Sequence, residues 1–162
     1  MFKQYLKIAD SKTAGQGVFT TIEIPADAPV AEATGQVLGE KELTNPVDPH
    51  LLQIGPNIFL NISGTLRFIN HSCDPNCRFH VMGNRAILYS LYVIPANAEL
   101  TFDYSTTSTD TLESWQMKCS CGSHKCRKTI SGYQYLDATL QEEYKKKGMI
   151  PLFITTPIFQ KV

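Results

Sequence analysis

Three cysteines near the C-terminal end of the 162-residue chain have a spacing that is typical of a metal clip. Cys119, Cys121 and Cys126 follow the pattern C-x-C-x4-C, and Gly122 between them lets the backbone turn. Thiolates are soft ligands, and Zn²⁺ binds four of them tetrahedrally at about 2.3 Å each. Three thiols leave one position open, so the cluster predicts a fourth ligand from elsewhere in the chain.

The remaining cysteines and the first residues bear on how this cluster is used. Five cysteines are an odd number, which argues against a complete set of disulfides. Residues 1–10 carry charges where a secretory signal needs an apolar core, so we expect an intracellular protein with reduced thiols. Its location would be nuclear in a eukaryote and cytoplasmic in a bacterium. Cys73, Cys77 and His124 are the candidates for the fourth ligand, although an isolated cysteine is more often a small buried hydrophobe.

The composition favours one compact domain and excludes two classes of partner. Fifteen basic residues balance fifteen acidic ones, so no bulk attraction to nucleic acid is indicated. No apolar run approaches the roughly 20 residues of a membrane helix. A chain of this length can bury a core of its own.

Strand signals dominate the first two thirds of the chain and predict a mostly β, β-rich α+β fold. We expect strands at residues 5–8, 17–21, 29–33, 57–61, 85–94 and 99–104. Residues 39–50 are typical of a short helical or irregular insert, and residues 105–113 of a polar loop. Asp137 can cap a helix over residues 138–147, and Gly148 can end it.

Several motifs then occur in a familiar order. Residues 15–18 read Gly-Gln-Gly-Val, residues 67–76 read Arg-Phe-Ile-Asn-His-Ser-Cys-Asp-Pro-Asn, and residues 99–104 read Glu-Leu-Thr-Phe-Asp-Tyr. Together with the cysteine cluster, this order resembles the SET-domain protein-lysine methyltransferases with a post-SET zinc motif. The resemblance extends from about residue 5 to residue 136.

The resemblance implies a SET fold of small curved β-sheets, in which the Asn-His segment makes a knot-like crossing with a C-terminal loop. It divides the chain into a SET domain (1–113), a post-SET segment (114–136) and a C-terminal helix and tail (137–162) within one globular unit. S-adenosylmethionine would bind on one face, and a lysine of a histone tail or of another protein would enter a narrow channel from the other.

The resemblance also implies which residues hold the cofactor and the metal. The cofactor residues would be Gly15, Gln16, Gly17, Val18, Arg67, Phe68, Asn70, His71 and Tyr104. The glycines permit a close approach of the backbone, and an asparagine offers both a donor and an acceptor. The zinc ligands would be Cys73, Cys119, Cys121 and Cys126. Without the resemblance, the glycines would suggest a simple tight turn, and His71 a buried histidine that ties two crossing segments together.

Tyr104 and Phe102 are the residues that the resemblance places at the reaction. A lysine ammonium, with a pKa of about 10.4, has no lone pair with which to attack a methyl group. A dry channel beside a sulfonium lowers that pKa, and a tyrosine oxygen can align the amine. In the family, phenylalanine at the position of Phe102 leaves room for di- or trimethylation. The alternative for Phe102 is a core aromatic on a strand.

Two departures from the family pattern matter for function. Ala33 stands where many members carry a channel-lining tyrosine, so either another aromatic such as Tyr89 or Tyr92 compensates or the channel is wider. Lys128 stands where the family has a glycine. Ala33 keeps a second hypothesis open, that of a catalytically idle module which binds a protein partner. A third hypothesis is a group-transfer enzyme that acts on a small amine.

Overall fold

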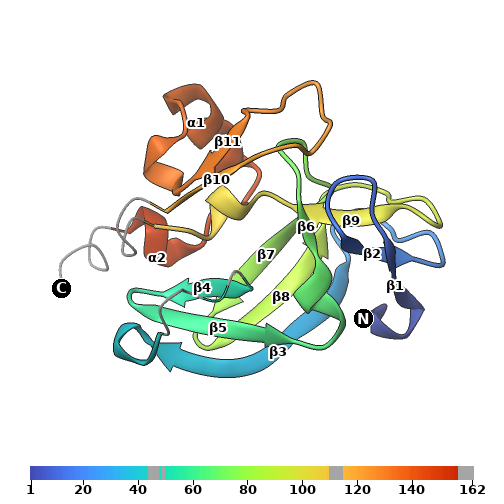
Figure 1. Ribbon diagram of the computed structural model, residues 1–162, viewed down its shortest axis with the longest axis horizontal. Helices are drawn as coiled ribbons and strands as arrows, with labels where there is room; N and C mark the ends of the chain where they lie inside the picture. The colour runs from blue at the N-terminus through green and yellow to red at the C-terminus, as the bar shows by residue number, and fades with distance from the viewer. Residues whose placement is uncertain (44–47, 49, 110–114, 157–162) are drawn as a thin grey trace.

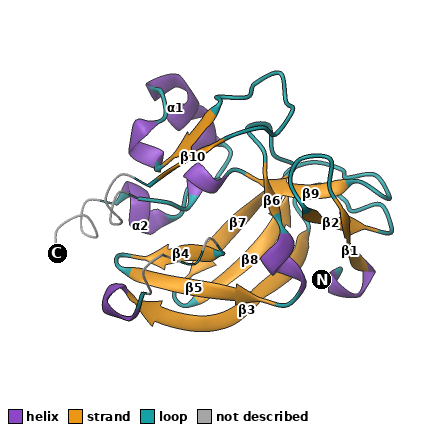
Figure 2. Ribbon diagram, viewed as in Figure 1, coloured by secondary structure: helices purple, strands orange, loops and turns teal. Residues whose placement is uncertain are grey.

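The computed structural model describes residues 1–43, 48, 50–109 and 115–156, which form three β-sheets and two α-helices (Figures 1 and 2). The five-stranded sheet has the order β4-β5-β3-β8-β7, with β3 at Pro29–Gly39, β4 at Leu51–Gly55, β5 at Ile58–Ser63, β7 at Cys77–Met82 and β8 at Arg85–Ser90. The four-stranded sheet has the order β1-β2-β9-β6, with β1 at Leu6–Asp10, β2 at Gln16–Thr20, β6 at Asn70–His71 and β9 at Glu99–Phe102. A mostly β fold of curved sheets is therefore confirmed.

The long strand β3 joins two parts of the five-stranded sheet, because it pairs with β8 through its first half and with β5 through its second. The close approach of β5 requires a glycine at position 35, where a Cβ atom would lie 1.9 Å from the Asn61 carbonyl oxygen. The core lies between the sheets and is formed by aliphatic side chains together with Phe79 and Phe102.

The pairing of β6 with β9 brings the two most informative motifs together. Among the described strands it is the only parallel pairing, with Asn70 opposite Thr101 and His71 opposite Phe102. Asn76 extends the contact, since its side chain donates to the Glu99 carbonyl oxygen at 2.7 Å and accepts from the Thr101 amide at 2.9 Å. Residues 70–76 and 99–104, distant in sequence, therefore form one rigid crossing.

The last third of the described chain packs over this crossing, at the upper left of Figure 1. It contains the hairpin of β10 (Gln116–Lys118) and β11 (Thr129–Ser131), then α1 (Ala138–Lys146) and α2 (Leu152–Thr155). The prediction for α1 is confirmed: the Asp137 carboxylate accepts from the Leu140 amide at 3.0 Å, and Gly148 follows with φ +61°. The 3₁₀ turns lie at Lys3–Tyr5, Glu40–Glu42, Thr65–Phe68, Tyr104–Thr106 and Tyr133–Tyr135.

One buried carboxylate, that of Asp103, ties this last third to β9. Asp103 is fully buried and accepts from both terminal nitrogens of Arg127 at 2.7 and 2.8 Å. The same carboxylate accepts from the Tyr144 hydroxyl at 2.8 Å and from the Ser105 amide at 3.0 Å. A buried charge is tolerated only when it is paired and fully hydrogen-bonded, and these contacts meet that requirement.

Some strand predictions were wrong at their ends or incomplete. The strand expected over residues 85–94 ends at Ser90, where the chain leaves β3 and the Leu91 amide donates to the Asn76 carbonyl oxygen. β4 and β7 were not predicted, although the alternating burial of β7 follows the period-2 pattern of its sequence. The expected insert over residues 39–50 and the loop over 105–113 lie partly outside the described residues.

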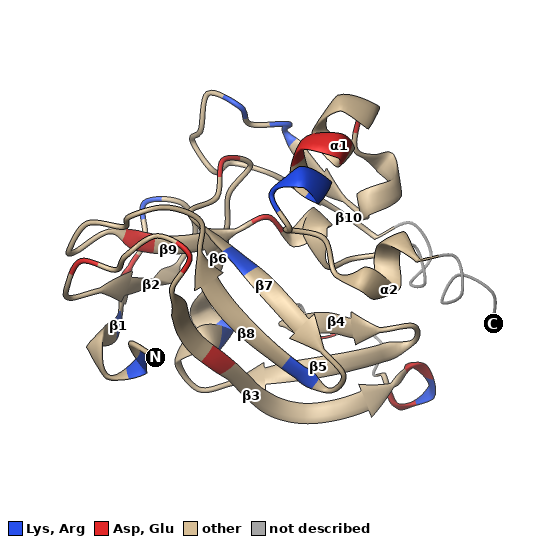
Figure 3. Ribbon diagram, turned by 180° about the vertical axis from the view of Figure 1, so that it is seen from behind, with Lys and Arg blue, Asp and Glu red and all other residues tan. Residues whose placement is uncertain are grey.

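Charged residues of both signs are distributed over many elements rather than gathered on one sheet (Figure 3). This arrangement agrees with the balanced composition. No helix within the described ranges is long and apolar enough to span a membrane.

We predict that Tyr144→Phe lowers the free energy of unfolding by about 1.5–3 kcal/mol, because it removes a hydrogen bond to a buried charged group. Chemical denaturation monitored by circular dichroism measures this change. Tyr5→Phe is the matched control, since the Tyr5 side chain is exposed and its loss of a hydroxyl should change stability by less than about 0.5 kcal/mol. Equal effects of the two substitutions would contradict the anchoring role of Asp103.

Candidate functional site

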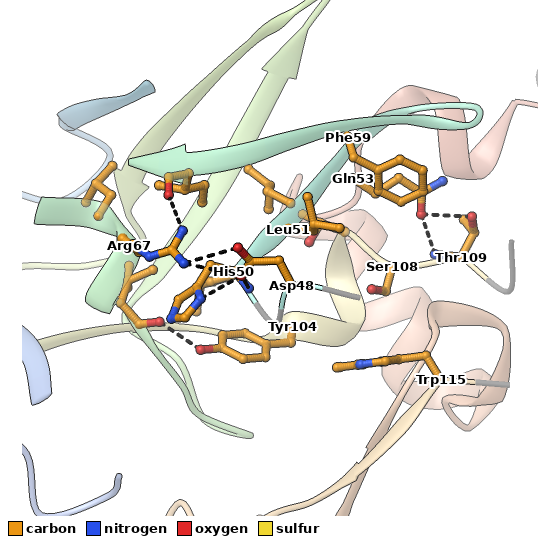
Figure 4. A pocket seen from close by; sticks show the side chains of 16 residues that line it. Asp48, His50, Leu51, Gln53, Phe59, Arg67, Tyr104, Ser108, Thr109 and Trp115 are labelled. Carbon is orange, nitrogen blue, oxygen red and sulfur yellow. Dashed lines mark hydrogen bonds and ion pairs between the residues drawn. The ribbon is translucent and has the colours of Figure 1, made fainter. Parts of the chain in front are cut away.

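A cavity of about 160 Å³ lies against the crossing of β6 and β9 (Figure 4). Its inner lining is apolar and includes Leu66, Ile69 and Phe102, each about 5% exposed or less. Tyr104 and Trp115 add aromatic surface. The shape and lining suit a long aliphatic side chain with a polar end.

Tyr104 presents a neutral hydroxyl in this pocket. Its hydroxyl donates to the Ile69 carbonyl oxygen at 2.8 Å. Burial, and secondarily the Glu99 carboxylate, raises the pKa of Tyr104 to about 12. The Phe102 ring lies 4.8 Å from the rings of both Tyr104 and Phe79. Phe102 is therefore at once a core aromatic and part of the pocket wall.

Asn70 and Gly17 meet where β2, β6 and β9 come together. The Asn70 amide donates to the Gln16 carbonyl oxygen at 3.0 Å and to Glu99 Oε1 at 2.8 Å. A Cβ atom at position 17 would lie 2.2 Å from Glu99 Oε1, so a larger residue there would displace the Glu99 side chain, to which Asn70 donates. Gly15 has φ +47°, a left-handed conformation that glycine adopts without strain.

His71 is neutral, and its tautomer is defined by its neighbours. Burial lowers the pKa of His71 to about 4, although the Asp103 carboxylate opposes this shift. The Tyr104 amide donates to Nδ1 at 3.2 Å, so Nδ1 is the acceptor and Nε2 carries the hydrogen. The 3.5 Å approach of Nδ1 to Asp103 Oδ1 is therefore not an ion pair. Nε2 lies 3.2 Å from the sulfur of Cys73 and donates to it.

Cys73 joins the C-terminal thiols, as the resemblance implies. The ligand atoms of His71, Cys73, Cys119 and Cys121 all lie within 4.8 Å of one another. The Cys119 sulfur is 3.8 Å from that of Cys73 and 3.6 Å from that of Cys126. Ligands at about 2.3 Å from a tetrahedral zinc lie roughly 3.8 Å apart, so these separations fit the ion.

The choice between Cys126 and His71 as a ligand follows from the hydrogen bonds. His71 donates its Nε2–H to the Cys73 sulfur. A residue that donates to a metal ligand in this way orients that ligand and does not itself bind the metal. Hydrogen bonds from backbone amides and thiols outweigh the burial that opposes ionisation of Cys121, and lower its pKa to about 7. The group of ligand atoms within 4.8 Å of one another contains His71 rather than Cys126, but Cys126 also lies 3.6 Å from Cys119, and we propose the four thiols as the zinc ligands. Cys77 is fully buried in the main core, apart from this cluster.

Other predicted residues occupy different environments. Arg67 lines the pocket, where it donates to Asp48 at 3.1 Å and to Asn61 at 3.0 Å. Phe68 packs against the core, and Val18 is completely buried within it. The structure gives no contact that distinguishes these three as cofactor residues.

The pocket is lined by aromatic residues that the sequence did not indicate. Ala33 is buried in the core and does not line the pocket. Tyr89 and Tyr92 do not line this pocket either: Arg78 lies over the Tyr89 ring, and the Tyr92 hydroxyl donates to the Pro75 carbonyl oxygen. Phe59 and Trp115 line the pocket instead.

Sequence reasoning also missed the polar residues of the pocket, among them Asp48, His50 and Gln53. They belong to a segment of the chain without a recognisable motif. Trp115 is the single tryptophan of the sequence and stands just before the cysteine cluster, which was an available signal.

Comparison with known families decides the identity. A model described as "SET domain" matches residues 15–105, more than half of the chain. The chain belongs to the SET domain family. This SET domain is 30% identical over 146 residues to histone-lysine N-methyltransferase trithorax of Drosophila virilis. The alignment covers 80% of this chain and 4% of the relative. It is 32% identical over 145 residues to histone-lysine N-methyltransferase SETD1 of Drosophila melanogaster, covering 80% of this chain and 9% of the relative.

Solved structures resemble this SET domain as well. A crystal structure of KRYPTONITE in complex with mCHG DNA and SAH aligns with a TM-score of 0.62 and 31% identity, over 77% of this chain and 28% of that one. A second, in complex with mCHH DNA, H3(1-15) peptide and SAH, has a TM-score of 0.63 and 29% identity, over 77% of this chain and 29% of that one. The SET domain thus spans less than a tenth of these curated relatives and under a third of the solved chains.

We predict one zinc per chain, bound by Cys73, Cys119, Cys121 and Cys126. Elemental analysis of protein purified without added metal measures the stoichiometry. Cys121→Ser should lower zinc content and loosen the C-terminal third, because one of four soft ligands is lost. Cys77→Ser is the matched control and should leave the zinc content unchanged. A folded protein without metal, or equal loss in both variants, would contradict this ligand set.

Proposed function

We propose that this SET domain is an S-adenosylmethionine-dependent protein-lysine N-methyltransferase. One observation carries the proposal: the Tyr104 hydroxyl donates to the Ile69 carbonyl oxygen at the apolar wall of the pocket, beside the crossing that holds Asn70 and His71. Membership of the SET domain family and similarity to curated histone-lysine N-methyltransferases support it.

The pocket residues suit the demands of the reaction. An aliphatic stem packs against Leu66, Ile69 and Phe102, and the apolar surroundings disfavour the ammonium form of the amine. Tyr104 remains protonated and donates to Ile69, so its oxygen is held in one place and can accept a hydrogen bond from the amine. Orientation and electrostatic stabilisation of the developing positive charge then supply much of the rate.

The cofactor proposal rests on the solved neighbours and on the motif residues. Both KRYPTONITE structures contain SAH, the form that S-adenosylmethionine takes after it has given up its methyl group. In this chain the cofactor-binding site would be formed by the backbone of residues 15–18 and by Asn70 and His71. Tyr104 would lie between this site and the pocket. Asn70 is already oriented by Gln16 and Glu99.

The substrate class is a lysine on a protein. The second KRYPTONITE structure was solved with an H3(1-15) peptide, and the curated relatives are named for histone-lysine methylation. We therefore propose that the substrate of this chain is a lysine of a histone tail or of another protein, and that the reaction takes place inside the cell. The division into a SET domain (1–113), a post-SET segment (114–136) and a C-terminal helix and tail (137–162) belongs to the same proposal. Trp115, which lines the pocket, gives the second segment a direct part in the site.

The alternative, an idle module that binds a partner, draws support from Ala33. Binding of the cofactor would not separate the two functions, but transfer of a labelled methyl group to protein would. The decisive assay is incubation with labelled S-adenosylmethionine and candidate proteins, followed by mass spectrometry of the modified residue. A third class, transfer to a small amine, would appear there as label in small molecules alone.

We predict that Tyr104→Phe retains the affinity for S-adenosylhomocysteine but lowers turnover by at least about 10²-fold, because an oriented oxygen is lost from the transition state. Calorimetry and a turnover assay on the same sample test both parts. Asn70→Ala provides the contrast, since it should weaken cofactor affinity first. Turnover close to wild type in Tyr104→Phe would remove Tyr104 from the reaction.

Phe102 supports the finer proposal of di- or trimethylation. Its ring has no hydroxyl to hold a water or a methylated amine in one orientation. We predict that Phe102→Tyr lowers the methylation state of the product while the first transfer survives. The readout is the ratio of mono-, di- and trimethyl-lysine on one identified substrate at matched turnover. Phe79→Tyr is the control for added polarity in the core, because the Phe79 ring also contacts Phe102 but does not line the pocket. An unchanged ratio in Phe102→Tyr would show that product state is set elsewhere.

A further inference from the structure

Three polar residues, Asp48, His50 and Arg67, form a connected group on the wall of the pocket that contains Tyr104 (Figure 4). Asp48 Oδ1 lies 2.8 Å from His50 Nδ1, and Asp48 Oδ2 lies 3.1 Å from Arg67 Nη2. Their side chains are between 26% and 36% exposed, whereas the apolar lining is buried. The group therefore lies at the end of the pocket that communicates with solvent.

Asp48 is held as an anion and fixes the orientation of the His50 ring. Burial opposes ionisation of Asp48, but hydrogen bonds from the backbone amide and ring of His50 and from Arg67 outweigh it and lower its pKa to about 2. The His50 amide donates to the same Oδ1 at 2.9 Å. A carboxylate can only accept, so His50 Nδ1 carries the hydrogen, and Nε2 is the nitrogen at which the ring can gain or lose a proton. Figure 4 shows the ring projecting between Arg67 and Tyr104.

The proposed reaction needs such an acceptor. A lysine enters the pocket as an ammonium and must lose one proton before its nitrogen can attack. Tyr104 does not suit this task, because its hydroxyl already donates to the Ile69 carbonyl oxygen and remains protonated. The other charged groups of the pocket wall are Asp48, which is paired, and Arg67, which cannot accept a proton. Among the described residues that line the pocket, His50 is the one whose imidazole nitrogen can take up a proton.

We propose that His50, oriented by Asp48, accepts the proton that the substrate ammonium releases before methyl transfer. The inference rests on the proposed function and adds a residue to it. The N–H bond of the ammonium breaks and its proton passes to His50 Nε2. The amine lone pair then forms the new N–C bond while the C–S bond of the sulfonium breaks and its electron pair stays on sulfur. The His50 imidazolium returns its proton to solvent, with which the exposed end of the pocket communicates.

A purely structural role for His50 is the competing explanation, since the Asp48–His50 contacts also close a local turn. The two explanations differ in their pH dependence. A structural role lowers the rate by a similar factor at every pH. A proton acceptor changes the pH dependence of the rate. With His50 present, the rate should stop rising at a pH above which the imidazole can accept the proton. Without it, the rate should keep rising with pH toward the lysine pKa of about 10.4.

The test is the pH profile of kcat for wild type and His50→Gln at saturating cofactor and peptide. Glutamine keeps a polar side chain of similar reach but cannot take up a proton. We expect kcat of His50→Gln to fall about 10²-fold at pH 7 and to recover as the pH rises. A peptide whose lysine carries a sulfur in its side chain, and therefore a more acidic amine, should be less affected by the substitution. Asp48→Asn should give a smaller fall with the same trend.

Three controls separate the outcomes. His80→Gln, on an exposed position of β7, should leave the profile unchanged. Melting temperature and S-adenosylhomocysteine affinity of His50→Gln should match wild type. A parallel downward shift of its profile at every pH, with equal effects on both peptides, would overturn the role of His50 while the proposed function stands. Absence of methyl transfer by the wild-type protein would overturn both together.

Discussion

The carboxylate of Asp103 is the interaction on which the arrangement of the site depends. It lies between β9 and the C-terminal third, and it binds Arg127 and Tyr144 from that third. Removal of Arg127 would leave the buried carboxylate without its charged partner, at a cost of about 3–5 kcal/mol. Since Tyr104 is the next residue in the chain, the anchor of the C-terminal third and the proposed reaction centre are set by the same few backbone atoms.

The cysteine cluster and this ion pair lie on either side of one segment. Arg127 follows Cys126 directly, and its amide approaches the Cys73 sulfur at 3.4 Å. Lys128, where the family has a glycine, adopts φ +66°, a left-handed conformation that costs a residue with a side chain about 1–2 kcal/mol. The Lys128 carbonyl oxygen nevertheless accepts from the Cys119 amide at 2.8 Å. The anchors on either side therefore hold the turn in a conformation that its own sequence disfavours.

The motifs made the fold class, the family and the meeting of Cys73 with the C-terminal thiols predictable from sequence. Short-range signals also predicted the helix that follows Asp137, because a cap and a terminal glycine act locally. They failed for β4 and for the end of the strand at Ser90, where pairing with distant segments decides the outcome. Asp48 and His50 gave no signal, because their significance arises only when the fold brings them beside Tyr104. Likewise, nothing in the sequence near Ala33 indicated that Phe59 and Trp115 line the pocket.

Trp115 joins two regions that are otherwise chemically distinct. Its indole packs against the cluster of Cys73, Cys119 and Ile130, and it also lines the pocket. It is the only tryptophan in the sequence. The chain thus carries a single indole at the boundary between a sulfur-rich cluster and the pocket. Its emission wavelength and quenching would report the polarity of that boundary in solution, without any label and without interference from a second indole.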